Sequence, residues 1–114
     1  MTTVEIYKDK SGSYRGFLCM GHADYAGKFL FHREPDILCA AISMLVMNTL
    51  NSLEELAGES LAVTAREETG FIKCDIESSL QEKSVFLLDS MVFGLEKLSE
   101  EYGTRYLQVK IKEV

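Results

Sequence analysis

The sequence is poor in proline and glycine, which interrupt regular secondary structure, and in cysteine, which forms disulfides. Its 114 residues include one proline, eight glycines and three cysteines, and 46% of them are hydrophobic. This composition excludes a fibrous or intrinsically disordered protein. A chain of this length can bury a sufficient core without disulfides, so we expect one domain that spans residues 1–114.

Basic residues are also scarce. The 12 lysines and arginines are outnumbered by 18 aspartates and glutamates, which gives a formal net charge of -6. The sequence has no basic stripe with interleaved aromatic residues, and an acidic surface repels phosphate backbones. We therefore expect no direct binding of nucleic acid. The charge suits a basic protein or peptide as the partner.

The sequence lacks a segment typical of export or membrane insertion. The first ten residues include Glu5 and Asp9 and have no apolar core, which excludes a signal peptide. The longest nearly apolar run has 14 residues, 37–50, and is interrupted by Ser43, Asn48 and Thr49, so it is too short and too polar to cross a bilayer. We expect a cytoplasmic protein without a membrane partner. The three cysteines, an odd number, are then expected to be free thiols. Cys19 and Cys74 lie in strand-like segments, where we expect them to act as small hydrophobic residues.

Hydropathy periodicity predicts five strands and two helices in the order ββαββαβ. The segments that alternate with the period of half-buried strands are 2–8, 14–20, 60–68, 71–77 and 105–112. Hairpins account for two of the pairings, so we expect an α+β fold with mostly antiparallel strands and both helices on the sheet. The residues expected to face the core from the last three strands are Leu61, Val63, Ala65, Ile72, Cys74, Ile76, Leu107, Val109 and Ile111.

Each helix has predicted boundaries. The first begins at Asp36, or at the proline before it, and ends at Gly58. Because it is apolar on nearly every side over residues 37–47, we expect burial all round, in a core or against a second subunit. The second helix begins after Ser79, which forms a capping box with Glu82, and ends at Gly103.

Cys39 and His22 are the residues whose positions indicate chemistry. Cys39 falls in the first turn of the first helix, where unpaired backbone amides and the helix dipole favour the thiolate, the nucleophilic form of cysteine. His22 leaves the second strand next to flexible Gly21 and can reach that thiol as a base, then serve as acid to a leaving amine. The same amides can stabilise a developing oxyanion.

Neighbouring residues could support this pair or have ordinary structural roles. Asp36 and Ser43 lie three residues before and four after Cys39, on one helical face. Asp36 either caps the helix or orients His22, and Ser43 either bonds back to a helix carbonyl or supports the site. His32 could join the pair in a metal site, but the spacing matches no common zinc pattern, so we expect no metal and no cofactor.

The segment between the histidine and the cysteine has no settled period and reads as a mobile loop. It contains an apolar island made of Phe29, Leu30 and Phe31. These residues either anchor the loop on the core or line and cover a peptide-binding cleft.

The motif GHA at residues 21–23, followed by DILCAAIS at residues 36–43, resembles the signature of the Prp-type ribosomal-processing cysteine proteases. The resemblance extends over the whole chain, although the segment between the two motifs is longer than is usual in that family. It implies a homodimeric endopeptidase that removes the N-terminal extension of bacterial large-subunit ribosomal protein twenty-seven. It also implies His22 and Cys39 as the catalytic dyad, with Gly21, Asp36 and Ser43 in supporting positions.

Two hypotheses follow for function. The first is a cysteine protease in which Cys39 attacks a peptide carbonyl and His22 transfers the proton. The second is a non-enzymatic ribosome-assembly factor that binds a basic ribosomal protein tail through the same acidic cleft. A thiol-transfer protein is less favoured, because Cys39 has no cysteine near it in the sequence to resolve a mixed disulfide.

Overall fold

The structure, a computed structural model, describes residues 1–22 and 37–114. It confirms the predicted order ββαββαβ. The elements are β1 (Thr2–Lys8), β2 (Tyr14–Met20), α1 (Ile37–Asn51), β3 (Leu61–Arg66), β4 (Phe71–Ile76), α2 (Glu82–Tyr102) and β5 (Leu107–Glu113). A π-helical turn at Ser52–Leu56 extends α1, and a 3-10 turn at Glu67–Thr69 joins β3 to β4.

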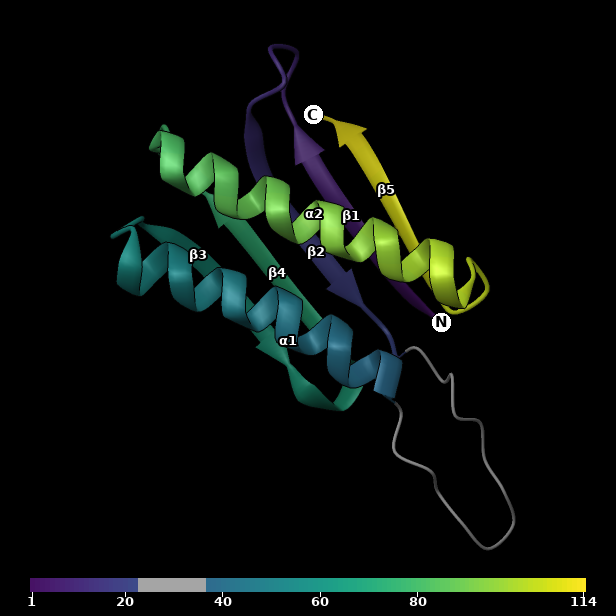
Figure 1. The fold of residues 1–114 in the computed structure, drawn as a ribbon. Helices are drawn as coiled ribbons and strands as arrows, with labels where there is room; N and C mark the ends of the chain where they lie inside the picture. Colours follow the sequence, from purple (N-terminus) through teal and green to yellow (C-terminus); the bar gives the residue numbers. More distant parts are fainter. Residues whose placement is uncertain (23–36) are drawn as a thin grey trace, which may run out of the picture.

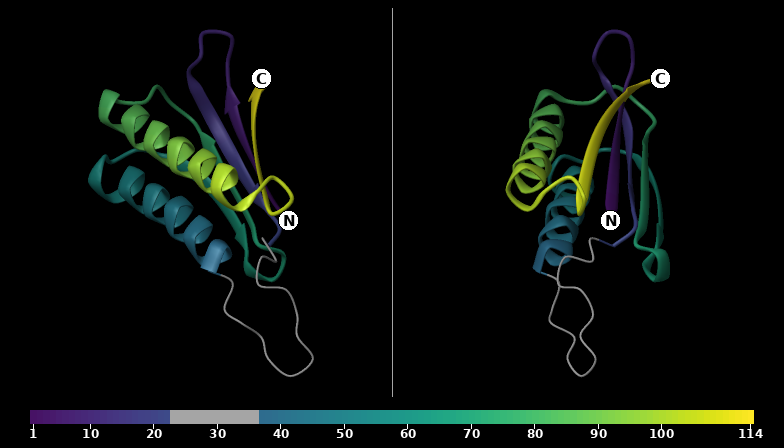
Figure 2. Two further views of the ribbon diagram at one scale, coloured as in Figure 1. Left: turned by 45° about the vertical axis from the view of Figure 1, so that its right-hand side comes forward. Right: turned by 90° about the vertical axis from the view of Figure 1, so that its right-hand side faces the viewer.

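The five strands form one sheet in the order β3-β4-β2-β1-β5. The pairs β1–β2, β2–β4 and β3–β4 are antiparallel, and only β1–β5 is parallel, because α2 carries the chain back across the sheet before the last strand. Both helices lie side by side on the same face of the sheet (Figures 1 and 2). The molecule is thus a two-layer α+β fold, as predicted.

One hydrophobic core fills the space between the two layers. Alternate residues of the central strands point into it, and Val4, Ile6, Phe17 and Cys74 are at most 1% exposed. The helices contribute Leu38, Ile42, Val46, Leu88, Met91 and Leu95 to the same cluster. Cys19 and Cys74 are both buried in it, which confirms that they act as small hydrophobic residues.

Within the described residues of the single chain the first helix is not buried all round, so its predicted burial in the core is wrong, and burial against a second subunit stays a prediction. Ile37, Met44 and Met47 on α1 are 58%, 65% and 42% exposed. Ile37 and Met44 lie on the side of the helix away from the core, whereas Met47, although partly exposed, also lines a cavity between α1 and the sheet. An apolar sequence on every face therefore leaves an uncovered apolar stripe in a single chain.

The predicted inward residues of the two outermost strands are only partly covered. Val63 of β3 is 40% exposed, Ala65 is exposed as well, and Ile111 of β5 is 51% exposed. Both strands lie at the edges of the sheet, where the helix layer ends. Leu61, Leu107 and Val109 lie in or against the core as predicted, but the covered face does not extend to the other predicted residues of these two strands.

The start of α2 also differs from the prediction. The helix begins at Glu82 after Gln81, and no side chain caps it, so the capping box of Ser79 with Glu82 does not form. Instead, the Gln81 backbone N–H donates to Glu59 Oε2 at 3.0 Å and its side-chain Nε2 donates to the Ala57 carbonyl at 2.6 Å. A tertiary contact with the end of the first helical segment thus replaces the local cap. The other end is as predicted, since the Gly103 N–H bonds the Ser99 carbonyl at 2.9 Å.

The helical stretch Ile37–Leu56 meets the length and hydropathy criteria of a membrane span. It has 20 residues and a mean hydropathy of 1.4, so the expectation that this region is too short and too polar does not hold on composition alone. The core helix of a globular domain meets the same criteria. Leu38, Ile42 and Val46 are at most 2% exposed within the shared core, so we assign the helix to that core.

Candidate active site

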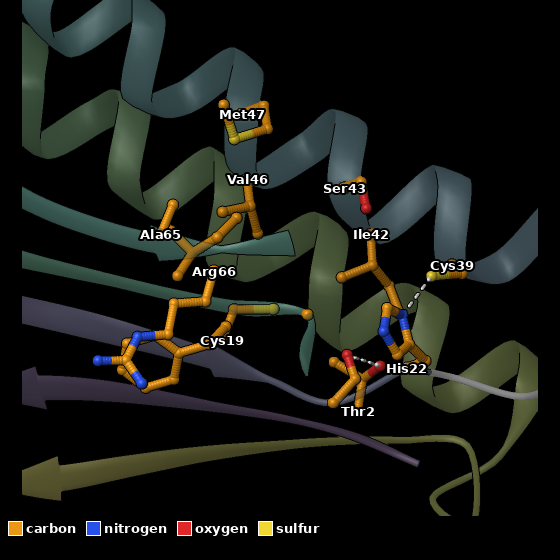
Figure 3. Close-up of a pocket in the computed structure, with 14 residues that line it drawn as sticks. Thr2, Cys19, His22, Cys39, Ile42, Ser43, Val46, Met47, Ala65 and Arg66 are labelled. Carbon is orange, nitrogen blue, oxygen red and sulfur yellow. Dashed lines mark hydrogen bonds between the residues drawn. The ribbon is translucent and has the colours of Figure 1, made fainter. Parts of the chain in front are cut away.

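Cys39 and His22, 17 residues apart in the sequence, lie together in the structure. Cys39 Sγ is 3.8 Å from His22 Nδ1, within hydrogen-bonding range for sulfur (Figure 3). Which atom donates depends on which imidazole nitrogen carries the proton. A thiol in this contact can pass its proton to the ring and become a nucleophile.

The core fixes the position of the thiol. Cys39 is half-buried in the first turn of α1, the end of a helix at which backbone N–H groups lack intrahelical acceptors. Leu38 beside it is 0% exposed, and Ile42 one turn later is 2% exposed. These anchors hold the first turn against the sheet, so the thiol is attached to a rigid element.

The imidazole is held by the end of β2. His22 follows Gly21, whose φ of +90° is in a region that residues with side chains rarely adopt. The Thr2 hydroxyl donates to the Gly21 carbonyl at 3.5 Å, a contact between the start of β1 and the residue before the histidine (Figure 3). A Cβ at Gly21 would lie 2.5 Å from the Met1 carbonyl oxygen, so this position requires glycine.

The dyad lies at a cavity between α1 and the sheet. One wall is formed by α1, the floor by inward residues of β2, β3 and β4, and one end by the β3–β4 turn. The lining residues are Thr2, Cys19, Gly21, His22, Cys39, Ile42, Ser43, Val46, Met47, Ala65, Arg66, Gly70, Phe71 and Ile72. Most of these side chains are apolar, which suits an apolar group of a peptide next to the thiol.

The other two thiols have a different environment. Burial raises the pKa of Cys19 to about 11, with a smaller contribution from nearby Cys39, and burial raises the pKa of Cys74 to about 12. Both therefore remain protonated at neutral pH. Cys39 is the cysteine that combines partial exposure with an imidazole contact.

The structure brings together four of the predicted site residues. Gly21, His22, Cys39 and Ser43 all line the cavity, and Ser43 lies one turn after the cysteine (Figure 3). The remaining predictions lie outside the described residues, namely those on Asp36, the mobile loop, its Phe29, Leu30 and Phe31 island, and His32. Among residues 1–22 and 37–114, no group of three or more histidines, cysteines, aspartates and glutamates is arranged to hold a metal ion.

Two residues at the site were not predicted from the sequence. Thr2 was assigned only to a strand, and Gly70 only to a hairpin connection, yet both contact the segment that carries His22. For Gly70 the sequence signal was the glycine itself, which lies at a turn where positive φ is common. Its contact with a residue 48 positions earlier depends on sheet order, which local patterns do not reveal.

A thiol beside an imidazole, at the start of a core helix and on an apolar cavity, is an arrangement typical of enzymes that use cysteine as a nucleophile. The model of the family described as "Cysteine protease Prp" matches residues 1–108. The chain belongs to this family of cysteine proteases.

Individual proteins agree with the family match. The "Ribosomal processing cysteine protease Prp" of Bacillus subtilis (strain 168) is 26% identical over 106 residues, which cover 90% of each chain. SMU.848 from Streptococcus mutans is similar with a TM-score of 0.82 and 29% identity, covering 100% of this chain and 96% of that one. The ribosomal processing protease Prp from S. aureus, in complex with a covalently linked product peptide, has the same fold, with a TM-score of 0.84, 23% identity and coverage of 98% and 100%.

Proposed function

We propose that this protein is an endopeptidase that processes a ribosomal protein, with Cys39 as the nucleophile and His22 as the general base and acid. The observation that carries the proposal is the 3.8 Å contact between Cys39 Sγ and His22 Nδ1. Membership in a protease family favours this hypothesis over the non-enzymatic assembly factor.

The proposed reaction has two halves. The Cys39 thiolate attacks the scissile carbonyl carbon, and the resulting oxyanion accepts hydrogen bonds from N–H groups in the first turn of α1. The carbon–nitrogen bond then breaks, and protonated His22 gives its proton to the leaving amine. In the second half, His22 takes a proton from water as the water oxygen attacks the thioester carbonyl carbon. The carbon–sulfur bond then breaks, which restores the Cys39 thiolate beside protonated His22, and the new carboxylic acid loses its proton to solvent.

Residues near Cys39 and His22 have proposed roles in holding or orienting these two side chains. Gly21 fixes where the chain leaves β2, and Ser43 borders the cavity one turn from Cys39. We assign Asp36 to the start of α1, as a cap or as a partner of the imidazole. For Phe29, Leu30 and Phe31, which lie outside the described residues, we propose from the sequence a role in binding the substrate.

For the substrate, we propose the N-terminal extension of bacterial large-subunit ribosomal protein twenty-seven. Similarity to the ribosomal processing protease of Bacillus subtilis supports a ribosomal protein as the substrate. The apolar lining around Ile42, Val46 and Ile72 suits an apolar or aromatic residue before the scissile bond. The net charge of -6 suits a sequence that is basic after it.

We further propose that the enzyme acts in the cytoplasm as a homodimer. The outer faces of the two helices expose Ile37, Met44, Phe86 and Phe93, each at least 58% accessible in the single chain. Neighbouring exposed apolar side chains of this size are typical of an interface. Both helices lie on one face of the sheet, so a second copy could cover both stripes (Figure 2).

The dyad is tested by incubating the purified protein with a peptide that spans the N-terminal region of the host's ribosomal protein twenty-seven, with products identified by mass. We expect one cleavage by the wild type, none by Cys39→Ala, and a rate reduced at least about 100-fold by His22→Ala. Cys74→Ala is the control, because it removes a thiol that does not line the cavity. Equal cleavage by the dyad variants would contradict the mechanism. Wild-type cleavage of casein but not of this peptide would contradict the substrate alone.

A further inference from the structure

The turn between β3 and β4 packs against His22 through a residue without a side chain. A Cβ placed on Gly70 would lie 3.1 Å from His22 Cε1 and 2.5 Å from the Gly21 carbonyl oxygen. The first distance is tighter than ordinary van der Waals contact, and the second is shorter than real Cβ contacts. The histidine and the residue before it therefore occupy space that any other residue at position 70 would need.

The same backbone segment is also held from β1. The Gly21 carbonyl that faces Gly70 accepts the hydrogen bond from the Thr2 hydroxyl. Two segments distant in the sequence, the start of β1 and the β3–β4 turn, thus contact the last residue before His22. Together they determine where the imidazole stands relative to α1, which carries Cys39.

We propose that Gly70 is a positioning residue of the dyad, resting on the proposed function. Its missing side chain allows the imidazole to lie 3.8 Å from Cys39 Sγ. The side chain of His22 is exposed, so it can turn away when a methyl group appears at position 70. The Gly21 carbonyl belongs to the backbone, so relieving its clash with the new methyl group would shift the chain just before His22. Either change separates Nδ1 from the sulfur.

The chain contains a matched control for the backbone effect. Gly58 has a φ of +69°, close to the +61° of Gly70, but a Cβ at Gly58 would meet no atom of residues 1–22 and 37–114 within 4 Å. Alanine at either position forces a side chain into the left-handed region, which is strained in both cases. Only alanine at position 70 also crowds the histidine. A comparison of the two variants therefore separates the contact from the strain.

The experiment compares Gly70→Ala with Gly58→Ala in cleavage of the ribosomal peptide and in alkylation of Cys39 by iodoacetamide across pH. We expect Gly70→Ala to lower kcat roughly 10- to 100-fold with little change in KM, since a small misplacement of a catalytic group has effects of this size. Its pH profile of alkylation should approach that of His22→Ala. Gly58→Ala should keep the wild-type kcat and profile. Equal kcat in the two glycine variants would overturn the proposal.

A measurement on the wild-type protein covers the case in which Gly70→Ala does not fold. The imidazole Hε1 proton of His22 should show a nuclear Overhauser contact with the Gly70 α-protons, because Cε1 is the ring atom that faces Gly70. The absence of that contact, with both resonances assigned, would overturn the proposal without any variant. Failure of the dyad itself is distinguishable, because His22→Ala and Cys39→Ala would then cleave normally.

Discussion

Gly94 of α2 lies directly against the side chain of Leu45 of α1. A Cβ at Gly94 would be 3.1 Å from Leu45 Cδ1 and 3.2 Å from Cδ2. Leu45 packs against the main core cluster, so this contact sets how closely the two helices approach each other over the sheet. The neighbouring atoms are the ends of a flexible side chain, which can yield to a small group but not to a large one.

Substitutions at Gly94 should therefore show two opposing effects. Alanine in a helix interior gains about 1 kcal/mol over glycine, whereas overpacking costs about 1–3 kcal/mol. We expect Gly94→Ala to change the free energy of unfolding by less than about 1 kcal/mol and Gly94→Leu to lower it by about 3 kcal/mol. Urea denaturation measures both, and Ser90→Leu at an exposed position of α2 is the control. A Gly94→Leu protein as stable as the control would show that the helices can separate freely.

Alkylation at pH 7 should distinguish Cys39 from the other two cysteines. Cys19 and Cys74 are 6% and 0% exposed, and burial raises the pKa of both thiols, so neither forms thiolate readily. We expect modification at Cys39 first, with Cys19 and Cys74 modified only on unfolding, and a slower reaction of Cys39 in His22→Ala. Intact mass followed by peptide mapping gives the order. Modification of all three cysteines at one rate would contradict the assignment of the reactive thiol.

Stability should fall at alkaline pH because of the buried thiols. In the unfolded chain a cysteine loses its proton near the ordinary value of 9.0, while the folded state holds it until the pKa of about 11 for Cys19 and about 12 for Cys74. Between these values the unfolded state binds fewer protons, so the free energy of unfolding decreases as pH rises. We expect a decline that starts near pH 9 in urea titrations. It should be shallower in Cys74→Ala than in the wild type. An identical slope in the two proteins would contradict this origin.

Charge on the outer helix faces should prevent dimer formation. Met44 and Phe93 are 65% and 62% exposed on α1 and α2, and a carboxylate at either position would be desolvated in an interface between two copies. We expect Met44→Glu and Phe93→Glu to sediment as monomers where the wild type sediments as a dimer. Val114→Glu is the control, because Val114 is similarly exposed, at 65%, but lies beyond β5. A wild-type monomer at all concentrations would contradict the homodimer.

Local sequence patterns were sufficient to predict the order and type of the elements. The alternation over residues 2–8 correctly predicted β1, and Gly103 correctly predicted the end of α2. The local signals failed where a distant segment decided the outcome. Ser79 resembled a cap, but the first turn of α2 is stabilised by Glu59 and Ala57.

For the site, too, the local features were predicted correctly and the contacts between distant segments were not. The sequence placed Cys39 at a helix start and His22 at a strand exit, and the structure brings them within 3.8 Å of each other. The contacts of Thr2 and Gly70 with the histidine segment could not be predicted, because they depend on which strands are neighbours in the sheet. The sequence also did not decide between the core and a second subunit as the cover of α1, for a related reason. Composition indicates that Met44 is apolar, but not whether another element covers it.

The parallel pairing of β1 with β5 makes the time of synthesis relevant to activity. A nascent chain that has been translated to Tyr102 already contains both residues of the proposed dyad, but it lacks the strand that completes one side of β1. In the complete protein the Thr2 N–H donates to the Tyr106 carbonyl at 2.9 Å, and the Thr2 hydroxyl donates to the Gly21 carbonyl. The hydrogen bonds that join Tyr106, Thr2 and Gly21 can therefore all form only after the C-terminal strand has left the ribosome, so a partly translated chain contains the residues of the proposed dyad without this complete set of contacts.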